Sequence, residues 1–413
     1  MRLPAHRRRS GHLAVLAIAA LAAVTVMNFP ADAQDDTQEW TPDGTATWFA
    51  PLTPDWDDIN VRSGAGGLSL NGGPAGTAGI RTNQLQGMLL TPAHRLDEPS
   101  NQVVAELVAD RPTGSTVDVD VRGTRADGSW TEWVPTSTES PSVLDALVTT
   151  VQTRVMLRSG EGGASPRAKS IRLTAQTIAQ TLLARPRSPL TYRVFATREG
   201  LVGGITANGH VIGERDHFVA LPSRRALAPR GSGDYTVKVC SDRGRCEWAP
   251  VWDVGPWNTT DDYWNSPDSR QSWKDLPPGR PQAQAAYHDG HNTGRDQFGR
   301  QVLNPAGIDL ADGTFWDGLG LRTNSWVTVT YMWTTGRPPA IVRVPLLHVR
   351  SGPGRHFAAV GLATQRATLP VECSVTGPVV NGSQGRTDRW LRIGPEQYVS
   401  AAHVSVPDPG DGC

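Results

Sequence analysis

The sequence predicts an all-β protein built from three consecutive strand-rich segments. Its 413 residues include 43 Gly and 32 Pro, so turn-forming residues recur at short intervals along the chain. In residues 117–122 and 326–331, apolar and polar side chains alternate, which is typical of half-buried strands. Long helical periodicity is missing after the N-terminal apolar run. These observations predict strands joined by turns, with only short helices.

Residues 1–33 are expected to form a signal peptide. Arg2 and the arginines at 7–9 precede an apolar run at 13–26, and Ala-Asp-Ala follows at 31–33. This is the order of a charged region, an apolar region and a cleavage site. The run is shorter than the ~20 residues of a comfortable membrane span. We therefore expect a secreted, extracellular protein with no membrane contact after cleavage; an uncleaved anchor is the alternative.

The charge balance argues against nucleic acid as a partner. Removing the expected signal peptide takes four Arg and one Asp from 40 basic and 40 acidic residues, which leaves 36 and 39. A net formal charge of −3 provides no basic field for a phosphate backbone.

The four cysteines are expected to form disulfides. Cys240 and Cys246 lie close together in the sequence, and Cys373 and Cys413 both lie near its end. In an oxidising compartment two local disulfides are favoured over a metal site, which would call for C-x-x-C pairs. Three pairings stay open from the sequence. No metal or cofactor is expected.

Residues 36–183 are expected to fold as a β-sandwich or jelly roll, because strand patterns recur there at the spacing of such folds. Trp130 and Trp133 follow a Gly-containing turn. If they alternate along one strand they would form a flat carbohydrate-binding face; the alternative is one core and one surface residue. The Pro-containing stretches 184–189 and 336–339 then separate the expected domains 188–335 and 340–413.

The central segment resembles a known barrel family. Residues 249–256, A-P-V-W-D-V-G-P, and 307–310, G-I-D-L, are similar to the V-x-V-x-D-x-G-P and I-D-L-S motifs of double-psi β-barrel proteins. That group includes expansins, rare-lipoprotein-A-like lytic transglycosylases and family-45 endoglucanases. The resemblance implies a six-stranded double-psi β-barrel in a secreted protein of actinobacterial type. The transglycosylases carry a histidine where this chain has Arg224 or Arg225, and the motif serine is Ala311 here.

The final segment resembles bacterial SH3-type domains. Residues 347–354, L-H-V-R-S-G-P-G, are similar to the L-N-V-R-S-G-P-G that opens such domains, and 390–393 and 397–400 resemble their closing strands. The resemblance implies an SH3-like barrel in residues 340–413 that binds peptidoglycan peptides. His348 replaces the usual Asn, and a passive stabilising module is the alternative.

Two aspartates are the candidate catalytic residues. Asp253 ends a hydrophobic strand between Trp252 and Trp257, where indole walls would raise the carboxyl pKa toward that of a general acid. The alternative is that Asp253 accepts backbone N–H groups near Gly255, which would lower its pKa. Asp309 follows in the G-I-D-L motif, with a helix N-cap as its structural alternative.

Aromatic residues of the same segment are the candidate sugar-binding groups. Trp257 and Trp264 lie in a polar stretch and are expected to form an exposed stacking surface, with Trp252 and His210 as further substrate contacts. The histidines within 288–291 lack a third ligand pattern and are expected in a polar loop.

The leading functional hypothesis is a secreted protein associated with cell-wall polysaccharide such as peptidoglycan. Its barrel would bind glycan and either cleave it, with Asp253 as general acid in a lytic-transglycosylase-like or glycoside-hydrolase-like reaction, or loosen it as expansins do. Whether the chain is an enzyme stays open at this point. A non-catalytic protein-binding or protease-inhibitor module is the alternative.

Overall fold

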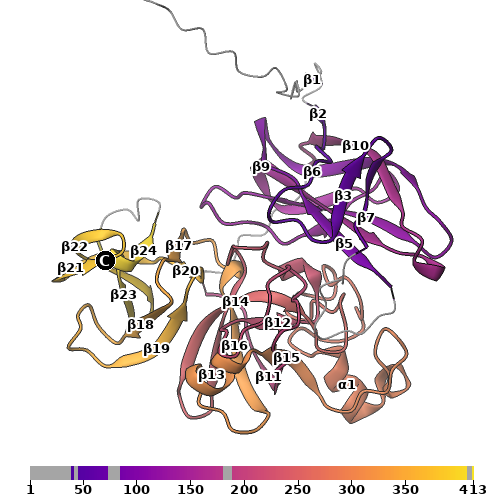
Figure 1. The fold of residues 1–413 in the computed structure, drawn as a ribbon. Helices are drawn as coiled ribbons and strands as arrows, with labels where there is room; N and C mark the ends of the chain where they lie inside the picture. The colour runs from indigo at the N-terminus through magenta and orange to yellow at the C-terminus, as the bar shows by residue number, and fades with distance from the viewer. Residues whose placement is uncertain (1–38, 41–44, 73–83, 180–187, 407–411) are drawn as a thin grey trace, which may run out of the picture. The chain divides into compact units, whose positions relative to one another are not determined.

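The computed structural model describes residues 39–40, 45–72, 84–179, 188–406 and 412–413, and these are all-β as the sequence predicted (Figure 1). The expected signal peptide lies outside these ranges, as does most of the first expected linker. Within them the structure has one α-helix, α1 (Gln282–Asp289), and no helix that is long and apolar enough to cross a membrane.

The N-terminal segment forms one ten-stranded sheet. Its strands are β1 (Glu39–Trp40), β2 (Ala46–Phe49), β3 (Val61–Gly64), β4 (Gly67–Leu70), β5 (Gln86–Leu90), β6 (His94–Asp110), β7 (Thr116–Gly123), β8 (Val134–Pro135), β9 (Ser142–Arg158) and β10 (Arg167–Gln176). The main path runs β1-β2-β10-β6-β9-β7-β8, while β4 also pairs with β10 and β5 with β9. The long strands β6 and β9 change partners along their length, so the sheet encloses its own apolar core.

Six strands of the middle segment close into a barrel. They are β11 (Thr191–Arg198), β12 (Val219–Leu221), β13 (Thr236–Ser241), β14 (Cys246–Val254), β15 (Ala306–Leu310) and β16 (Ser325–Tyr331). The order is β12-β15-β11-β16-β13-β14, and pairing of β14 with β12 completes the circle. Two pairs, β11–β15 and β12–β14, are parallel and the other four are antiparallel. This closed mixed barrel is consistent with the double-psi arrangement.

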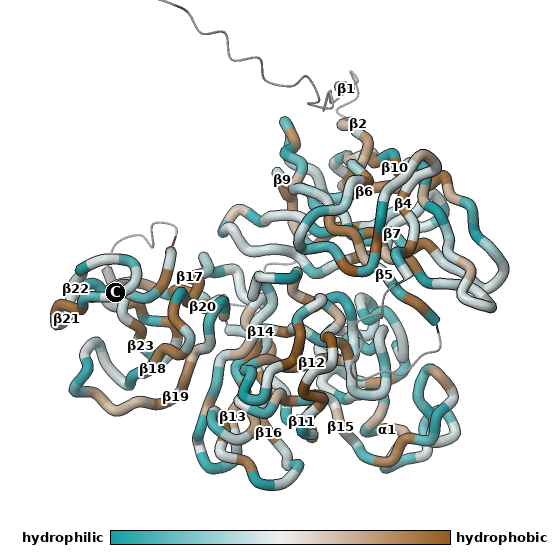
Figure 2. The backbone as a smooth tube through the Cα atoms, in the orientation of Figure 1, coloured by the Kyte–Doolittle hydropathy of each residue, from teal (hydrophilic) through white to brown (hydrophobic). Residues whose placement is uncertain are grey.

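Alternation along the barrel strands builds the core. Val194 and Ala196 of β11, for example, are fully buried, as are Val237 and Val239 of β13, while their neighbours in sequence are mostly less buried. Figure 2 shows hydrophobic residues concentrated along barrel strands such as β12, with hydrophilic residues in many of the loops.

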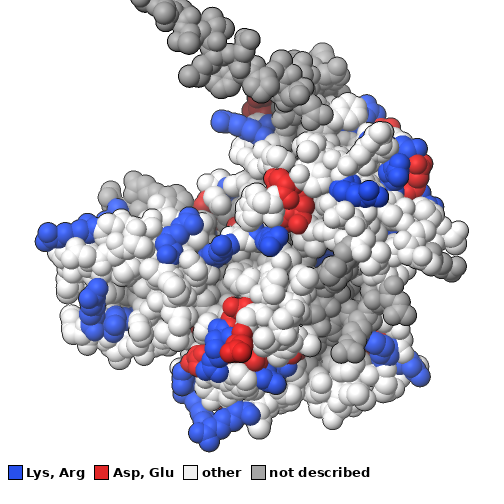
Figure 3. Space-filling model, in the orientation of Figure 1, with Lys and Arg blue, Asp and Glu red and all other residues white. Residues whose placement is uncertain are grey.

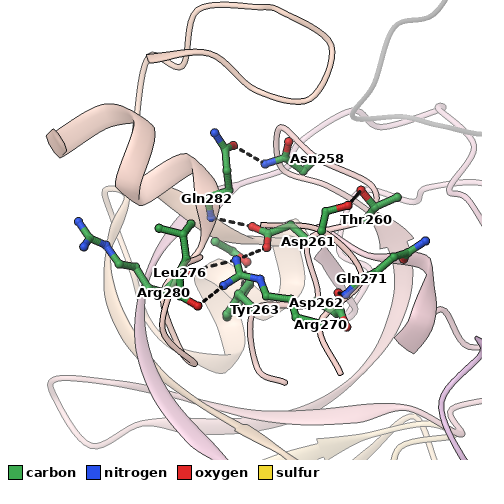
Figure 4. Close-up of polar contacts among 12 residues, drawn as sticks. Asn258, Thr260, Asp261, Asp262, Tyr263, Arg270, Gln271, Leu276, Arg280 and Gln282 are labelled. Carbon is green, nitrogen blue, oxygen red and sulfur yellow. Dashed lines mark hydrogen bonds and ion pairs between the residues drawn. The ribbon is translucent and has the colours of Figure 1, made fainter. Parts of the chain in front are cut away.

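A long insertion between β14 and β15 is held by a buried ionic network. It begins with a cis peptide bond between Gly255 and Pro256 and contains α1. Arg270 pairs with Asp261, and neither side chain is exposed; Asp261 also accepts the backbone N–H of Gln282 at 2.7 Å (Figure 4). Because a buried charge needs a partner, this pair fixes the path of an insertion with little regular structure.

The C-terminal segment contains β17 (Pro339–Val342), β18 (Leu346–Arg350), β19 (Ala359–Thr364), β20 (Thr368–Pro370), β21 (Cys373–Gly382), β22 (Gly385–Gly394), β23 (Gln397–Ser400) and β24 (Val404–Ser405). Strand β19 pairs in parallel with β14, so β19-β18-β23-β22-β21 extends the barrel sheet, while β20-β17-β24 forms a separate three-stranded sheet. Short helical turns complete the fold: η1 (Glu161–Gly163), η2 (Arg224–Ala226), η3 (His291–Gly294), η4 (Gly313–Gly318), η5 (Met332–Thr334) and η6 (Ala401–His403).

Both local disulfides form. Cys240–Cys246 joins the facing ends of β13 and β14, and Cys373–Cys413 ties β21 to the C-terminus. The expectation of two local bridges is therefore confirmed, and the three pairings left open reduce to this one.

The three segments pack against one another within the unit Thr37–Cys413. Trp133, which follows β7 in the N-terminal segment, lies in the apolar core of the barrel. Next to it, Glu132 accepts the indole N–H groups of Trp264 at 2.6 Å and Trp333 at 2.9 Å. Trp130 is instead partly exposed, so the two indoles form no common flat face.

Candidate functional site

Three carboxyl groups converge at one level of the barrel. Ala220 of β12 pairs with Asp253 of β14 on one side and with Asp309 of β15 on the other. Asp309 pairs in turn with Thr197 of β11, and Glu199 follows two residues later, just beyond the strand end. Since side chains two residues apart on an extended chain point the same way, this register brings Glu199 toward the aspartates.

Asp253 lies at the bottom of this carboxyl cluster, defined as Glu199, Asp253 and Asp309. It has no exposed surface, and its Oδ1 accepts the backbone N–H groups of Ala207 at 2.7 Å and Val254 at 2.8 Å. Its Oδ2 is buried without a donor from the described residues. Burial raises the pKa of Asp253, and the two backbone hydrogen bonds oppose that shift.

Glu199 supplies the missing partner for Asp253. Both of its carboxylate oxygens are buried, and no N–H or O–H group of the described residues reaches them. Burial first, and then the negative charge and hydrogen bond of Asp253, raise the pKa of Glu199 well above its ordinary value. The raised pKa favours the protonated form of Glu199, whose O–H can donate to the Asp253 carboxylate.

Asp309 is the member of the cluster that lies beside the turn after β14. The residue is partly exposed, as is Glu199, and the hydroxyl of Thr197 donates to its Oδ1. A Cβ on Gly255 would lie 3.7 Å from its Oδ2, so the turn that follows β14 passes directly beside this oxygen. Burial, reinforced by the charge of Asp253, raises the pKa of Asp309 to about 7. At neutral pH such a group both gives and takes a proton.

The structure separates Asp253 from the indole that precedes it. Trp252 and Asp253 are neighbours on β14 at a register shift in its pairing with β12, and Asp253 is fully buried whereas Trp252 is partly exposed. Trp252 stacks near Phe218 and His210, with ring centroids 5.8 and 4.8 Å away, and lines a cleft. Trp252 and His210 thus lie together as a candidate binding surface, in a cleft that none of the three cluster carboxyls lines.

Trp257 and Trp264 have different environments. Trp257 is partly exposed in the turn beside Asp309 and donates its N–H to Asn304 at 3.1 Å, so it remains a candidate sugar-stacking residue. Trp264 was expected to be exposed, and this expectation is wrong: it is fully buried against Tyr331 and Trp333. The polar residues that precede it, Asp261 and Asp262, form ion pairs with Arg270 and Arg225. The local sequence pattern does not reveal these pairs.

The alternatives left open for the two aspartates are partly resolved. Asp253 does accept backbone N–H groups, from Ala207 and Val254, yet its pKa is raised because burial outweighs those bonds. Asp309 is not a helix N-cap, since it lies inside β15 and the residue that caps the following helix η4 is Asp312.

Rare-lipoprotein-A-like transglycosylases carry a histidine where this chain has Arg224 or Arg225, and neither arginine is placed to act as an acid or base in its stead. Arg225 is held by Asp262 at 2.9 Å within the insertion. Arg224 donates to Gln86 of the N-terminal segment at 3.0 Å, and burial lowers its pKa to about 10. The Arg225 guanidinium therefore stabilises the insertion, and that of Arg224 joins the barrel segment to the N-terminal sheet.

Glu199 is the functional candidate that sequence reasoning missed. The sequence does hold a signal: Glu199 ends a strand and is followed by Gly200, much as Asp253 is followed two residues later by Gly255. A search for acids near strand ends before glycine would have found Glu199 and Asp253, while Asp309 came from the G-I-D-L motif.

Potential metal ligands come together elsewhere. Among the described residues, the carboxylates of Asp55, Asp57 and Asp58 lie close enough to surround an ion. Asp58 uses both oxygens to accept the N–H groups of Leu90 and Asp55, and Asp55 accepts that of Asp57. The arrangement is that of a turn stabilised by aspartates.

Comparison with known families points to the barrel alone. No curated protein matches the chain. Residues 190–330 match the model of a family described as "Domain of unknown function (DUF8814)". This range spans β11 to β16, so the matched region is the closed barrel together with its insertion and the whole carboxyl cluster.

Proposed function

We propose that this chain is a secreted enzyme that cleaves a cell-wall glycan, with Asp309 as its general acid. The observation that carries the proposal is the carboxyl cluster: burial raises the pKa of all three acids, and Asp309, with a pKa of about 7, lies beside the turn that follows β14. A stability role alone does not explain buried carboxyl oxygens without donors, because such groups are unfavourable for folding.

The reaction follows from the position of each proton. Protonated Asp309 gives its proton to the glycosidic oxygen as the bond to the anomeric carbon breaks. The positive charge that develops on the sugar is stabilised by the net negative charge of the Glu199–Asp253 pair. Asp309, now a carboxylate, then takes a proton from a hydroxyl of the same sugar as that oxygen bonds to the anomeric carbon. The product is an anhydro-sugar, and no second nucleophile is needed.

The turn from Gly255 to Trp257 would position the sugar ring. Trp257 has a positive φ of 62° and is partly exposed, and Gly255 of the same turn lies beside Asp309. An indole face beside an acid is suited to a pyranose ring. Trp257, rather than Trp264, therefore takes the stacking role.

The flanking segments fit a protein that works on an insoluble polymer. We propose that the barrel is of the double-psi type and that residues 340–413 form an SH3-like wall-binding unit, which the L-H-V-R-S-G-P-G motif supports. Several weak contacts to one polymer together give a higher affinity than each alone, because the first contact raises the effective concentration for the next. The two disulfides suit an oxidising, extracellular location.

The test is a panel of purified polymers. The whole chain is incubated with peptidoglycan, cellulose and chitin, and both the bound protein and the soluble fragments are measured. Release of fragments from one polymer supports the proposal. Binding without release favours expansin-like loosening, and binding to none of the three contradicts a glycan function and favours a protein partner.

A further inference from the structure

A second cleft lies beside Trp252, and its lining includes none of the three carboxyls of the cluster. Its volume is about 560 Å³, within the range of small-molecule sites. It lies within the unit Thr37–Cys413, and its walls come from all three segments of the chain. Its principal lining side chains are Trp56, His210, Arg215, Arg230, Trp252 and Arg366. We call it the Trp56–Trp252 cleft.

Two exposed aromatic surfaces face this cleft. Trp56 is 70 % exposed, which is unusual for an indole in a packed region. Trp252 is partly exposed and is held in place because its N–H donates to the carbonyl of Ser232 at 2.9 Å. Both rings are thus available to a ligand, and one of them is fixed by the barrel.

The cleft holds more positive than negative charge. Of the groups that line it, His210 is paired with Asp216 at 2.6 Å, and Arg215 is paired with Asp317. Arg230 and Arg366 have no carboxylate partner among the described residues. Figure 3 shows that basic side chains are scattered over the visible face rather than merged into one field. A local excess of two guanidinium groups is therefore a feature of this cleft.

The two cations are held next to Trp56. Arg230 donates from Nη1 to the backbone oxygen of Trp56 at 3.2 Å. Gly231 has a φ of +80°, and a Cβ there would lie 2.7 Å from Nη1 of Arg366 and 2.9 Å from the Trp56 ring. Only glycine therefore allows Arg366 and Trp56 to approach each other across this backbone, and the arrangement is built into the fold.

We propose that the Trp56–Trp252 cleft binds a sugar ring that carries an anionic group. The ring stacks on the indoles, while a carboxylate or phosphate is bound by Arg230 and Arg366. A planar guanidinium matches both anions with paired hydrogen bonds, and a partly enclosed cleft strengthens them. The proposal goes beyond the proposed cleavage reaction and is independent of the carboxyl cluster, none of whose members lines this cleft.

The experiment is calorimetric titration of the whole chain with matched pairs of sugars. Glucuronic acid and glucose 6-phosphate are compared with glucose, and N-acetylmuramic acid with N-acetylglucosamine. We expect each acidic sugar to bind at least tenfold more tightly than its neutral counterpart, and added salt to weaken that preference. Comparison of the carboxylate and phosphate sugars decides which anion the site prefers.

Variants connect this preference to the cleft. Arg230→Gln and Arg366→Gln should each reduce affinity for the acidic sugar about tenfold or more, while Arg386→Gln, at an exposed position on β22, should not. The Asp309→Asn variant should bind like wild type, so loss of catalysis and loss of this site are distinguishable. Equal affinity for acidic and neutral sugars, no binding of any acidic sugar, or unchanged binding by both arginine variants would overturn the proposal.

Discussion

At the scale of single residues, the proposed reaction depends on a proton shared between Glu199 and Asp253. Each of these carboxyls alone would be a buried acid without enough donors. With one proton between them they would carry one negative charge, and burial together with the charge of Asp253 raises the pKa of Asp309. Substitution of any of the three carboxyl residues should therefore affect proton binding more than it affects packing.

Asp253→Asn should be well tolerated. An amide of the same shape still accepts the N–H groups of Ala207 and Val254 at its oxygen, and its own NH₂ donates to Glu199. We expect a melting temperature at neutral pH equal to or above that of wild type, measured by calorimetry. A fall of several degrees would show that no proton is shared between the two carboxyls.

Stability should fall as the pH rises from about 4 to about 7, and Asp309 should contribute to that fall. Its pKa is raised to about 7 in the folded protein, so the folded state binds a proton more tightly than the unfolded state in this window. The stabilisation is present below the unfolded pKa and is lost as pH passes the folded value. Asp309→Asn should flatten the dependence relative to Asp268→Asn, an exposed control. Parallel curves for both variants would contradict the raised pKa.

At the scale of elements, two devices hold segments that have little regular structure. The disulfides close a short loop between β13 and β14 and a longer one from β21 to the C-terminus. The Asp261–Arg270 pair holds the insertion that follows β14 (Figure 4). The cysteine spacing made the first device predictable, whereas the second depends on which of several acids near Trp264 meets which arginine. Burial in the folded protein decides this pairing, and no characteristic spacing in the sequence predicts it.

The two disulfides should contribute unequally. Loop-closure entropy gives ~2 kcal/mol for the Cys240–Cys246 loop and ~4 kcal/mol for the Cys373–Cys413 loop. Paired Cys→Ser variants of each bridge, followed by urea denaturation, measure the difference. A larger loss from the short loop would contradict the entropic account.

Breaking the buried ion pair should be severe. Arg270→Ala leaves Asp261 buried among backbone groups without its cation, which should cost about 3–5 kcal/mol of unfolding free energy. Arg300→Ala, which removes a partly exposed partner of Asp296, is the matched control and should lose less. Similar losses in the two variants would mean that the insertion is held by other contacts.

At the scale of the whole molecule, contacts between the three segments explain where sequence reasoning succeeded and where it failed. The all-β class and the disulfides follow from local patterns and spacing, and the barrel was expected from the resemblance of two motifs to a barrel family. The burial of Trp264 does not, because its partner Glu132 lies over a hundred residues away in a different sheet. Glu199 was missed for a related reason. It becomes a candidate only because closure of the barrel brings the end of β11 close to Asp253 of β14.

Glu132 should couple the N-terminal sheet to the barrel. It accepts three N–H groups, from Trp264, Trp333 and Asn265, and hydrogen bonds to a charged acceptor are worth about 1.5–3 kcal/mol each when lost. Glu132→Ala should lower stability by about 2 kcal/mol or more and separate calorimetric unfolding into more than one transition. Glu139→Ala, at an exposed loop of the same segment, should do neither. A single unshifted transition in Glu132→Ala would show that the segments are coupled by other contacts.

The most direct test of the account is mass spectrometry of the fragments released from peptidoglycan in overnight digests. Wild-type protein and Asp268→Asn should both release anhydro-sugar products, whereas Asp309→Asn should release them ~10²–10⁴-fold more slowly while it still sediments with the polymer. Wild-type protein that releases no such product, or an Asp309→Asn variant as active as wild type, would contradict the assignment of Asp309 as a general acid.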